Sequence, residues 1–131
     1  MHDLGQANST DILIIGSGIA GLSLATALGY EGFSVTVIDG ASRPAHAPPG
    51  KELSDWDLRV SALTPASIAF LESIGAWKGA VSHRAGPYGA MRVWDANGSG
   101  RIAFHADEID VPSLGHIVEN REILQALLQS A

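Results

Sequence analysis

The sequence predicts a mixed α/β fold, and two observations carry this prediction. An apolar strand pattern over residues 11–15 passes through a glycine-rich turn into helical spacing, and a second strand pattern follows over residues 33–39. Further along, residues 90–106 alternate apolar and polar side chains on both sides of an Asn-Gly turn, which is typical of an antiparallel hairpin. The chain of 131 residues, with 46% hydrophobic residues, has room for one compact domain.

The overall composition excludes several classes of function. A net charge of −6 without any basic run argues against a nucleic-acid surface, which needs clustered lysine and arginine. The absence of cysteine excludes disulfides, thiolate metal sites and cysteine nucleophiles, and is compatible with a reducing cytoplasm. Residues 1–10 form a polar leader unlike a signal peptide, and no segment approaches the roughly 20 apolar residues that span a bilayer. We therefore expect a cytoplasmic protein in which any membrane contact is peripheral.

The first elements form a β-α-β unit. Residues 11–15, DILII, contain a continuous run of isoleucine and leucine bounded by glycine, which predicts a buried parallel strand. Small and apolar residues then recur at helical spacing over residues 19–30, and Gly29 and Gly32 close that helix. The second strand ends at Asp39, and the crossover between the two parallel strands should be right-handed.

The remaining elements are shorter. Residues 40–57 are rich in proline, alanine and glycine without a period, which predicts a surface loop. Thr64 is a good N-cap for a short helix with Pro65 at its first position. Beyond the hairpin, residues 114–120 predict another strand. Residues 121–131 predict a helix whose inner side carries Ile123, Leu124, Leu127 and Leu128.

The turn between the first strand and the helix has the spacing of a dinucleotide-binding loop. Gly16 permits the tight turn, Gly18 lets a pyrophosphate approach the backbone, and Gly21 lets helix and strand pack closely. The helix N-terminus offers free N–H groups to the anion. Asp39 is placed to accept hydrogen bonds from an adenosine ribose, and its charge disfavours the 2′-phosphate of NADP. The order of these features favours dinucleotide binding over a purely structural glycine turn, and it leaves NAD and FAD as alternatives.

Several longer stretches bear on this choice. GSGIAGLSLATALGYEGFSVTVID resembles the extended fingerprint of FAD-binding oxidoreductases. RVSALTPAS, MRVWD and LGHIVEN are similar, in the same order, to segments of aromatic-ring flavin monooxygenases of the para-hydroxybenzoate hydroxylase type, and within that class to the hydroxylases of ubiquinone biosynthesis. The resemblance implies a Rossmann-like, doubly wound FAD-binding domain interleaved with a substrate domain. Residues 11–131 would form the N-terminal part of the FAD-binding domain, incomplete relative to the family, and the hairpin at 88–108 would belong to the substrate-side sheet.

The resemblance also implies which residues bind the cofactor. Arg59 matches an arginine that reaches the cofactor, and Val60 and Ser61 would then lie near the flavin ring. Asn120 matches a position whose polar side chain contacts the cofactor, with Arg121 as a neighbouring candidate. Because the hard chemistry belongs to the cofactor, no catalytic side chain and no metal ligand is expected. The full cofactor-binding set is Gly16, Gly18, Ile19, Ala20, Gly21, Asp39, Arg59, Val60, Ser61, Asn120 and Arg121.

Structural interpretations compete with these roles. Without the family, Arg59 would be interpreted as a surface ion-pair partner of Asp55 or Asp57. Asn120 is a plausible N-cap whatever it binds. The three tryptophans are expected to pack against the protein. The histidines and carboxylates between residues 105 and 116 fit no common metal-site spacing.

The implied activity is hydroxylation of the aromatic ring of a lipid-like phenolic ubiquinone precursor, with FAD, O₂ and NADH or NADPH. Other ubiquinone-biosynthesis proteins are candidate partners. The chain ends before the segments that complete the FAD site in the family, so we expect the chain alone to aggregate, to bind FAD poorly and to be inactive. Two alternatives remain open, an NAD-binding dehydrogenase module and a non-catalytic assembly module.

Overall fold

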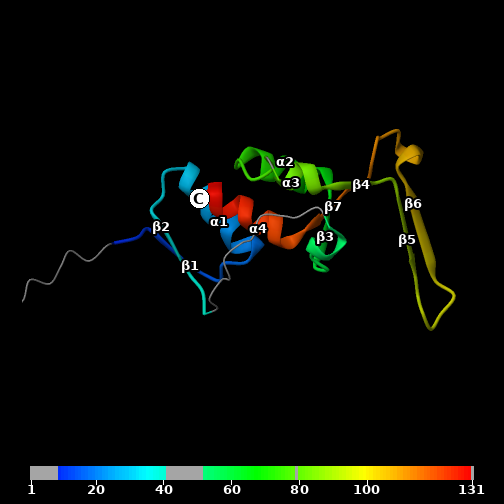
Figure 1. Cartoon of the computed structure of the whole chain (residues 1–131), viewed down its shortest axis with the longest axis horizontal. Coiled ribbons are helices and arrows are strands. Elements are labelled where there is room, and N and C mark those ends of the chain that lie inside the picture. The colour runs from blue at the N-terminus through cyan, green and yellow to red at the C-terminus, as the bar shows by residue number, and fades with distance from the viewer. Residues whose placement is uncertain (1–8, 41–51, 79, 131) are drawn as a thin grey trace, which may run out of the picture.

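The computed structural model describes residues 9–40, 52–78 and 80–130, and Figure 1 shows the path of the chain. The β1–β2 pair lies at one end, a long hairpin lies at the other, and the helices lie between them (Figure 1). In chain order, the described elements are β1 (Ile12–Ile15), α1 (Ile19–Tyr30), β2 (Val35–Ile38), η1 (Leu53–Asp55), β3 (Val60–Leu63), α2 (Pro65–Ser73), α3 (Ala80–Arg84), β4 (Gly86–Tyr88), β5 (Ala90–Trp94), β6 (Arg101–His105), η2 (Ala106–Ile109), β7 (Gly115–Glu119) and α4 (Asn120–Ser130).

The predicted β-α-β unit is confirmed. β1 and β2 pair in parallel, with Ile12 opposite Val35 and Ile15 opposite Ile38. The connecting helix α1 has the predicted bounds. Beyond its end, Gly32 adopts φ +87°, a left-handed conformation that glycine enters without a steric penalty and that turns the chain back toward β2.

The expected burial of the first strand is wrong for two of its side chains. Ile14 is buried, whereas Leu13 is 55% and Ile15 is 82% exposed. Alternate side chains of a strand point to opposite faces, so only the face that carries Ile14 packs against α1. The other face of the β1–β2 pair presents apolar side chains to solvent.

A second sheet has the order β3-β7-β4, with the central strand β7 antiparallel to both neighbours. The strand predicted over residues 114–120 is therefore confirmed as β7. The sequence analysis did not predict β3, β4 or α3. Their sequences, VSAL, GPY and AVSHR, are short and lack the continuous apolar run that marked β1.

The helix predicted after Thr64 is confirmed as α2. The Thr64 side chain accepts a hydrogen bond from the Ser67 N–H at 3.3 Å, and Pro65 occupies the first helical turn. Of the loop predicted over residues 40–57, residues 41–51 lie outside the described residues. The remainder is not entirely irregular, because Leu53–Asp55 form a short 3-10 helix.

The predicted hairpin is confirmed as β5 and β6, which form a two-stranded antiparallel sheet of their own. Val93 lies opposite Ile102 and Met91 lies opposite Phe104, so these four apolar side chains share one face. The expectation that Trp94 packs against the protein is wrong, since this residue is 71% exposed. The hairpin extends away from the helices (Figure 1).

The main core lies between the helices and β7. α4 packs against α1 and α3, and two of its predicted inward residues, Ile123 and Leu127, are fully buried. The prediction for Leu128 is wrong, because it is 45% exposed. The buried apolar cluster consists of Leu22, Leu71, Ile74, Ala76, Val81, Val118, Ile123, Ala126 and Leu127.

Candidate cofactor site

The glycine turn between β1 and α1 is shaped by its three glycines. Gly16 adopts φ +104°, and its N–H donates to the Ile38 carbonyl at 2.7 Å. A Cβ atom on Gly21 would lie 2.0 Å from the Gly16 carbonyl oxygen, so only glycine fits at that position. A Cβ on Gly18 would meet no atom within 4 Å, which leaves open space in front of the turn. The tight turn at Gly16 and the close packing at Gly21 are as the spacing predicted, and the approach of a pyrophosphate to Gly18 stays a prediction.

The N-terminus of α1 is suited to an anion. Gly18 is the N-cap and has no side chain that could accept from the first N–H groups, and the first turn contains no acidic residue. The free N–H groups and the helix dipole therefore point toward the open side of the turn. Ile19 and Ala20, both predicted as cofactor contacts, are the first two residues of this helix.

Asp39 follows β2 and reaches the same turn. Its Oδ2 accepts hydrogen bonds from the Ser17 N–H at 2.7 Å and from the Ser17 hydroxyl at 2.5 Å. The acid therefore lies beside the glycine turn, and it also holds the backbone of that turn in place. Sequence analysis did not identify this contact of Ser17.

Three of the other predicted residues meet where β3 and β7 pair. The Ser61 hydroxyl donates to Asn120 Oδ1 at 2.6 Å, and the Asn120 N–H donates to the Arg59 carbonyl at 2.9 Å. Val60 follows Arg59 and precedes Ser61 in the chain; it is the first residue of β3 and is 49% exposed. Asn120 is the first residue of α4, whereas the structural interpretation of the sequence made it the N-cap. Its side-chain oxygen accepts the hydrogen bond from Ser61.

The ion-pair interpretation of Arg59 is not supported. Its backbone N–H donates to Asp57 Oδ1 at 3.0 Å, but within the described ranges its guanidinium forms no ion pair with Asp55 or Asp57. Arg59 is exposed, which leaves its charge accessible to an anionic group.

Arg121 is held by protein groups. It donates to the Asp55 carbonyl and forms ion pairs with Glu119 at 2.8 Å and with Glu122 at 3.3 Å. Its side chain is 33% exposed, so part of the guanidinium still faces solvent. The structure thus gives Arg121 a structural role, and its contact with a cofactor stays a prediction.

A buried carboxylate beside this cluster was missed by sequence analysis. Glu119, the last residue of β7, is 1% exposed, and it accepts from Arg84 Nε at 2.5 Å and from the Asp57 N–H at 2.6 Å. The Arg84 guanidinium also lies 3.9 Å from the ring centroid of Trp56. One sequence signal could have revealed Glu119, namely a charged residue directly following the apolar strand residues Ile117 and Val118.

The surroundings of Glu119 keep it ionised. Burial raises the pKa of its carboxyl, but the hydrogen bonds from Arg84 and from the Asp57 N–H, together with the charge of Arg121, outweigh burial and hold the pKa below its ordinary value. The same hydrogen bond raises the pKa of Arg84. A buried ion of this kind is tolerated only because its partners satisfy it.

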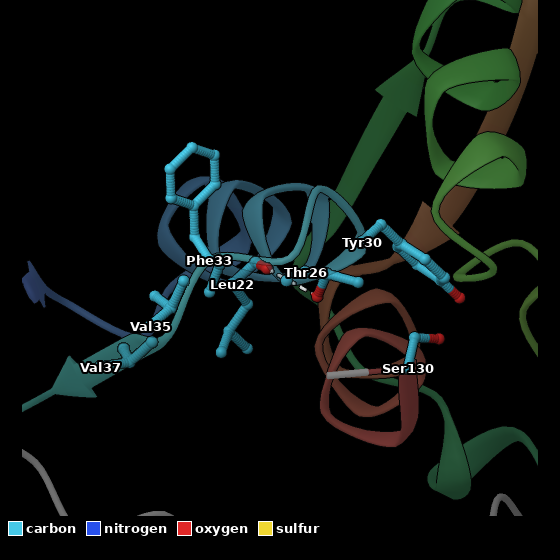
Figure 2. A pocket seen from close by; sticks show the side chains of 9 residues that line it. Leu22, Thr26, Tyr30, Phe33, Val35, Val37 and Ser130 are labelled. Carbon is cyan, nitrogen blue, oxygen red and sulfur yellow. Dashed lines mark hydrogen bonds between the residues drawn. The ribbon is translucent and has the colours of Figure 1, made fainter. Parts of the chain in front are cut away.

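A groove of about 400 Å³ lies elsewhere, between α1, β2 and the end of α4. Figure 2 shows Phe33, Val35 and Val37 on one side of it and Tyr30 and Ser130 on the other. Its lining is mainly apolar, and none of the predicted cofactor-binding residues contributes to it. The groove is therefore separate from the candidate site. The described residues also contain no group of three metal-ligating side chains.

Comparisons with known proteins agree with the fold and with the stretches identified in the sequence. Residues 14–62 match a family model described as an NAD(P)-binding Rossmann-like domain. The chain is 37% identical over 123 residues to 3-demethoxyubiquinol 3-hydroxylase of Escherichia coli (strain K12), covering 92% of this chain and 30% of that protein. It is 36% identical over 118 residues to ubiquinone hydroxylase UbiL of Rhodospirillum rubrum, covering 90% of this chain and 26% of that protein. Over about nine-tenths of its length, the chain is therefore similar to hydroxylases of ubiquinone biosynthesis.

The same resemblance extends to animals. The human mitochondrial ubiquinone biosynthesis monooxygenase COQ6 is 35% identical over 121 residues, covering 89% of this chain and 25% of that protein. The chain thus spans between a quarter and a third of the length of these hydroxylases. The family resemblance predicted from the sequence is confirmed.

Solved structures share the fold. The 2,6-dihydroxypyridine-3-hydroxylase of Arthrobacter nicotinovorans superposes with a TM-score of 0.53 at 20% identity, covering 92% of this chain and 26% of that one. The tetracycline destructase Tet(51) superposes with a TM-score of 0.52 at 21% identity, covering 91% of this chain and 27% of that one. The Rossmann-like fold predicted from the sequence is thereby confirmed.

Proposed function

We propose that this chain forms the FAD-binding portion of a flavin monooxygenase. The observation that carries the proposal is the glycine turn, in which Gly21 packs against Gly16 while the space in front of Gly18 stays open. The residues fit the diphosphate and adenosine of FAD, because free N–H groups of α1 face that space and Asp39 lies beside it.

The cluster at the junction of β3 and β7 supports a flavin-side contact. Ser61 and Asn120 are hydrogen-bonded to each other, and Arg59 is joined to Asn120 through its carbonyl. In the proposed site, the exposed guanidinium of Arg59 binds an anionic part of the cofactor, while Ser61, Asn120 and Val60 line the flavin side. FAD, when bound, would supply the redox and oxygen chemistry, and these side chains would bind and orient it.

The proposed substrate is a phenolic ubiquinone precursor, with NADH or NADPH as electron donor. Support comes from the names of the homologues, which include 3-demethoxyubiquinol 3-hydroxylase. Residues 11–131 would then belong to the FAD-binding domain and the hairpin at 88–108 to the substrate-side sheet. Among the described residues, no helix is both long and apolar enough to cross a membrane. We propose peripheral contact at the inner face as the route to the lipid-like substrate.

A second candidate function is an NAD-binding dehydrogenase module. It is favoured by the description of the matching family model, which names NAD(P) as the ligand of this type of domain. The β1–α1–β2 unit serves NAD and FAD equally well, because both carry an ADP moiety. The cluster of Arg59, Ser61 and Asn120 favours FAD. A non-catalytic assembly module would bind neither ligand.

A titration with FAD, NAD and ADP separates these functions. The parent chain is compared with Gly18→Val, whose Cβ enters open space and whose extended backbone accepts valine, so the fold should be unchanged. We expect weak, saturable FAD binding that Gly18→Val reduces at least about tenfold, because the side chain occupies the diphosphate position. Preferred binding of NAD would support the dehydrogenase module. Equal FAD binding by the two chains would refute the proposed use of the glycine turn.

A further inference from the structure

The segment before β3 is held at three points by three consecutive residues. Glu119 accepts from the Asp57 N–H, Asn120 donates from its backbone to the Arg59 carbonyl, and Arg121 donates to the Asp55 carbonyl. The residues at the end of β7 and the start of α4 thus fix alternate residues of segment 55–59. This segment carries Arg59 directly into β3.

Glu119 is the buried member of these three. Its Oε2 is 2.6 Å from the Asp57 nitrogen and 2.8 Å from Arg121 Nη2, while its Oε1 is 2.5 Å from Arg84 Nε. A carboxylate with 1% exposure is costly unless charge-assisted hydrogen bonds satisfy it, so its geometry is strongly constrained. Arg84 in turn lies against the Trp56 ring, so Glu119 acts on two residues of segment 55–59, on Asp57 directly and on Trp56 through Arg84.

We propose that Glu119 is a positioning residue for the flavin side of the candidate site, an inference that rests on the proposed function. Its carboxylate holds the Asp57 backbone and, through Arg84, the Trp56 ring, and so sets where Arg59 enters the site. Glu119 does not itself contact the cofactor. Its loss misplaces Arg59 relative to Asn120 and leaves the glycine turn on β1 and α1 unchanged.

The test compares two ligands that use different parts of the site. ADP fills only the part formed by the glycine turn and Asp39, whereas FAD also reaches the part that carries Arg59. We expect Glu119→Gln to weaken FAD binding about tenfold, as the loss of a well-placed charged contact does, and to change ADP binding by less than about twofold. Glu122→Gln is the matched control, since Glu122 is equally buried and belongs to the same ion-pair cluster.

Each outcome decides one point. If Glu119→Gln keeps the parent ratio of FAD to ADP affinity, or if Glu122→Gln lowers that ratio as much, the positioning role of Glu119 is refuted. If the parent chain binds FAD no more tightly than ADP, the proposed flavin contacts are refuted, and the inference fails with them. Circular dichroism establishes that the variants are folded at the temperature of the titration.

Amide hydrogen exchange in the parent chain tests the inference without any variant. The Asp57 N–H should exchange slowly, like the amides of β7, because it donates to a buried carboxylate. The conservative variant Glu119→Asp keeps the charge but is one methylene shorter, so it should release the Asp57 N–H and speed its exchange. Fast exchange in the parent, or unchanged exchange in Glu119→Asp, would overturn the role assigned to Glu119.

Discussion

Replacing Gly21 with alanine tests the close packing on which the glycine turn depends. The new Cβ would lie 2.0 Å from the Gly16 carbonyl oxygen, whereas ordinary contacts begin at 3.4 Å. The obstructing atom belongs to the backbone, so α1 and the turn must move apart by about 1.4 Å. Overpacking of this kind costs about 1–3 kcal/mol.

Gly29→Ala is the matched control for this substitution. Gly29 lies in the same helix, and a Cβ there would meet no atom within 4 Å. Both substitutions gain about 1 kcal/mol of helix propensity, so their difference isolates the clash. We expect Gly29→Ala to be stabilising and Gly21→Ala to be less stable than it by about 1–3 kcal/mol. The assay is urea denaturation followed by circular dichroism. Equal stability of the two variants would refute the packing argument.

Three further predictions concern other parts of the chain. Because the pKa of Glu119 is lowered on folding, its contribution to stability is present above its ordinary pKa of 4.5 and is lost as the pH falls through the lower folded value. Denaturation midpoints should therefore fall with acid more steeply in the parent than in Glu119→Gln. Near neutral pH, Glu119→Gln itself costs about 3–5 kcal/mol, because it removes the buried carboxylate that pairs with both Arg84 and Arg121. Thr64→Ala should lower the free energy of unfolding by about 1 kcal/mol and Thr64→Ser should hardly change it, since only alanine removes the cap of α2. Urea denaturation measures both values, and equal losses would show that the cap is wrongly assigned. Ile15→Lys should raise the protein concentration at which light scattering detects aggregation, and it should not lower the free energy of unfolding, because Ile15 is 82% exposed. A loss of stability would show that the side chain is buried in solution.

The part of the fold that the sequence predicted well is local in the chain. The glycine turn, α1 and the capped helix α2 depend on neighbouring residues, such as Thr64 with Ser67 and Gly21 with Gly16. Their signals are therefore complete within a short window of sequence. The position of Asp39 beside the turn could also be predicted, although 22 residues separate it from Ser17, because a standard β-α-β unit brings these ends together.

The part that was missed depends on pairing between distant segments. Ser61 and Asn120 are 59 residues apart, and Asp57 and Glu119 are 62 apart. Periodicity carries no information on which strand lies beside which, so the family resemblance identified Ser61 and Asn120 without predicting that they contact each other. Burial was misjudged for the same reason, since a strand of apolar residues such as Ile15 is buried only where another element covers its face.

Asp39 shows how an observed contact refines a predicted role. The sequence placed an acid beside the glycine turn for a ribose, and the structure adds that its Oδ2 already binds Ser17 through both the backbone N–H and the hydroxyl. An acid held in this way is oriented before any ligand arrives, so less conformational entropy is lost on binding. Its hydrogen bonds also fix the residue between Gly16 and Gly18, which links the shape of the turn to the acid that would recognise the ribose. The ADP end of the proposed site is therefore preorganised from within the β-α-β unit, whereas the flavin side depends on the buried contacts of Glu119.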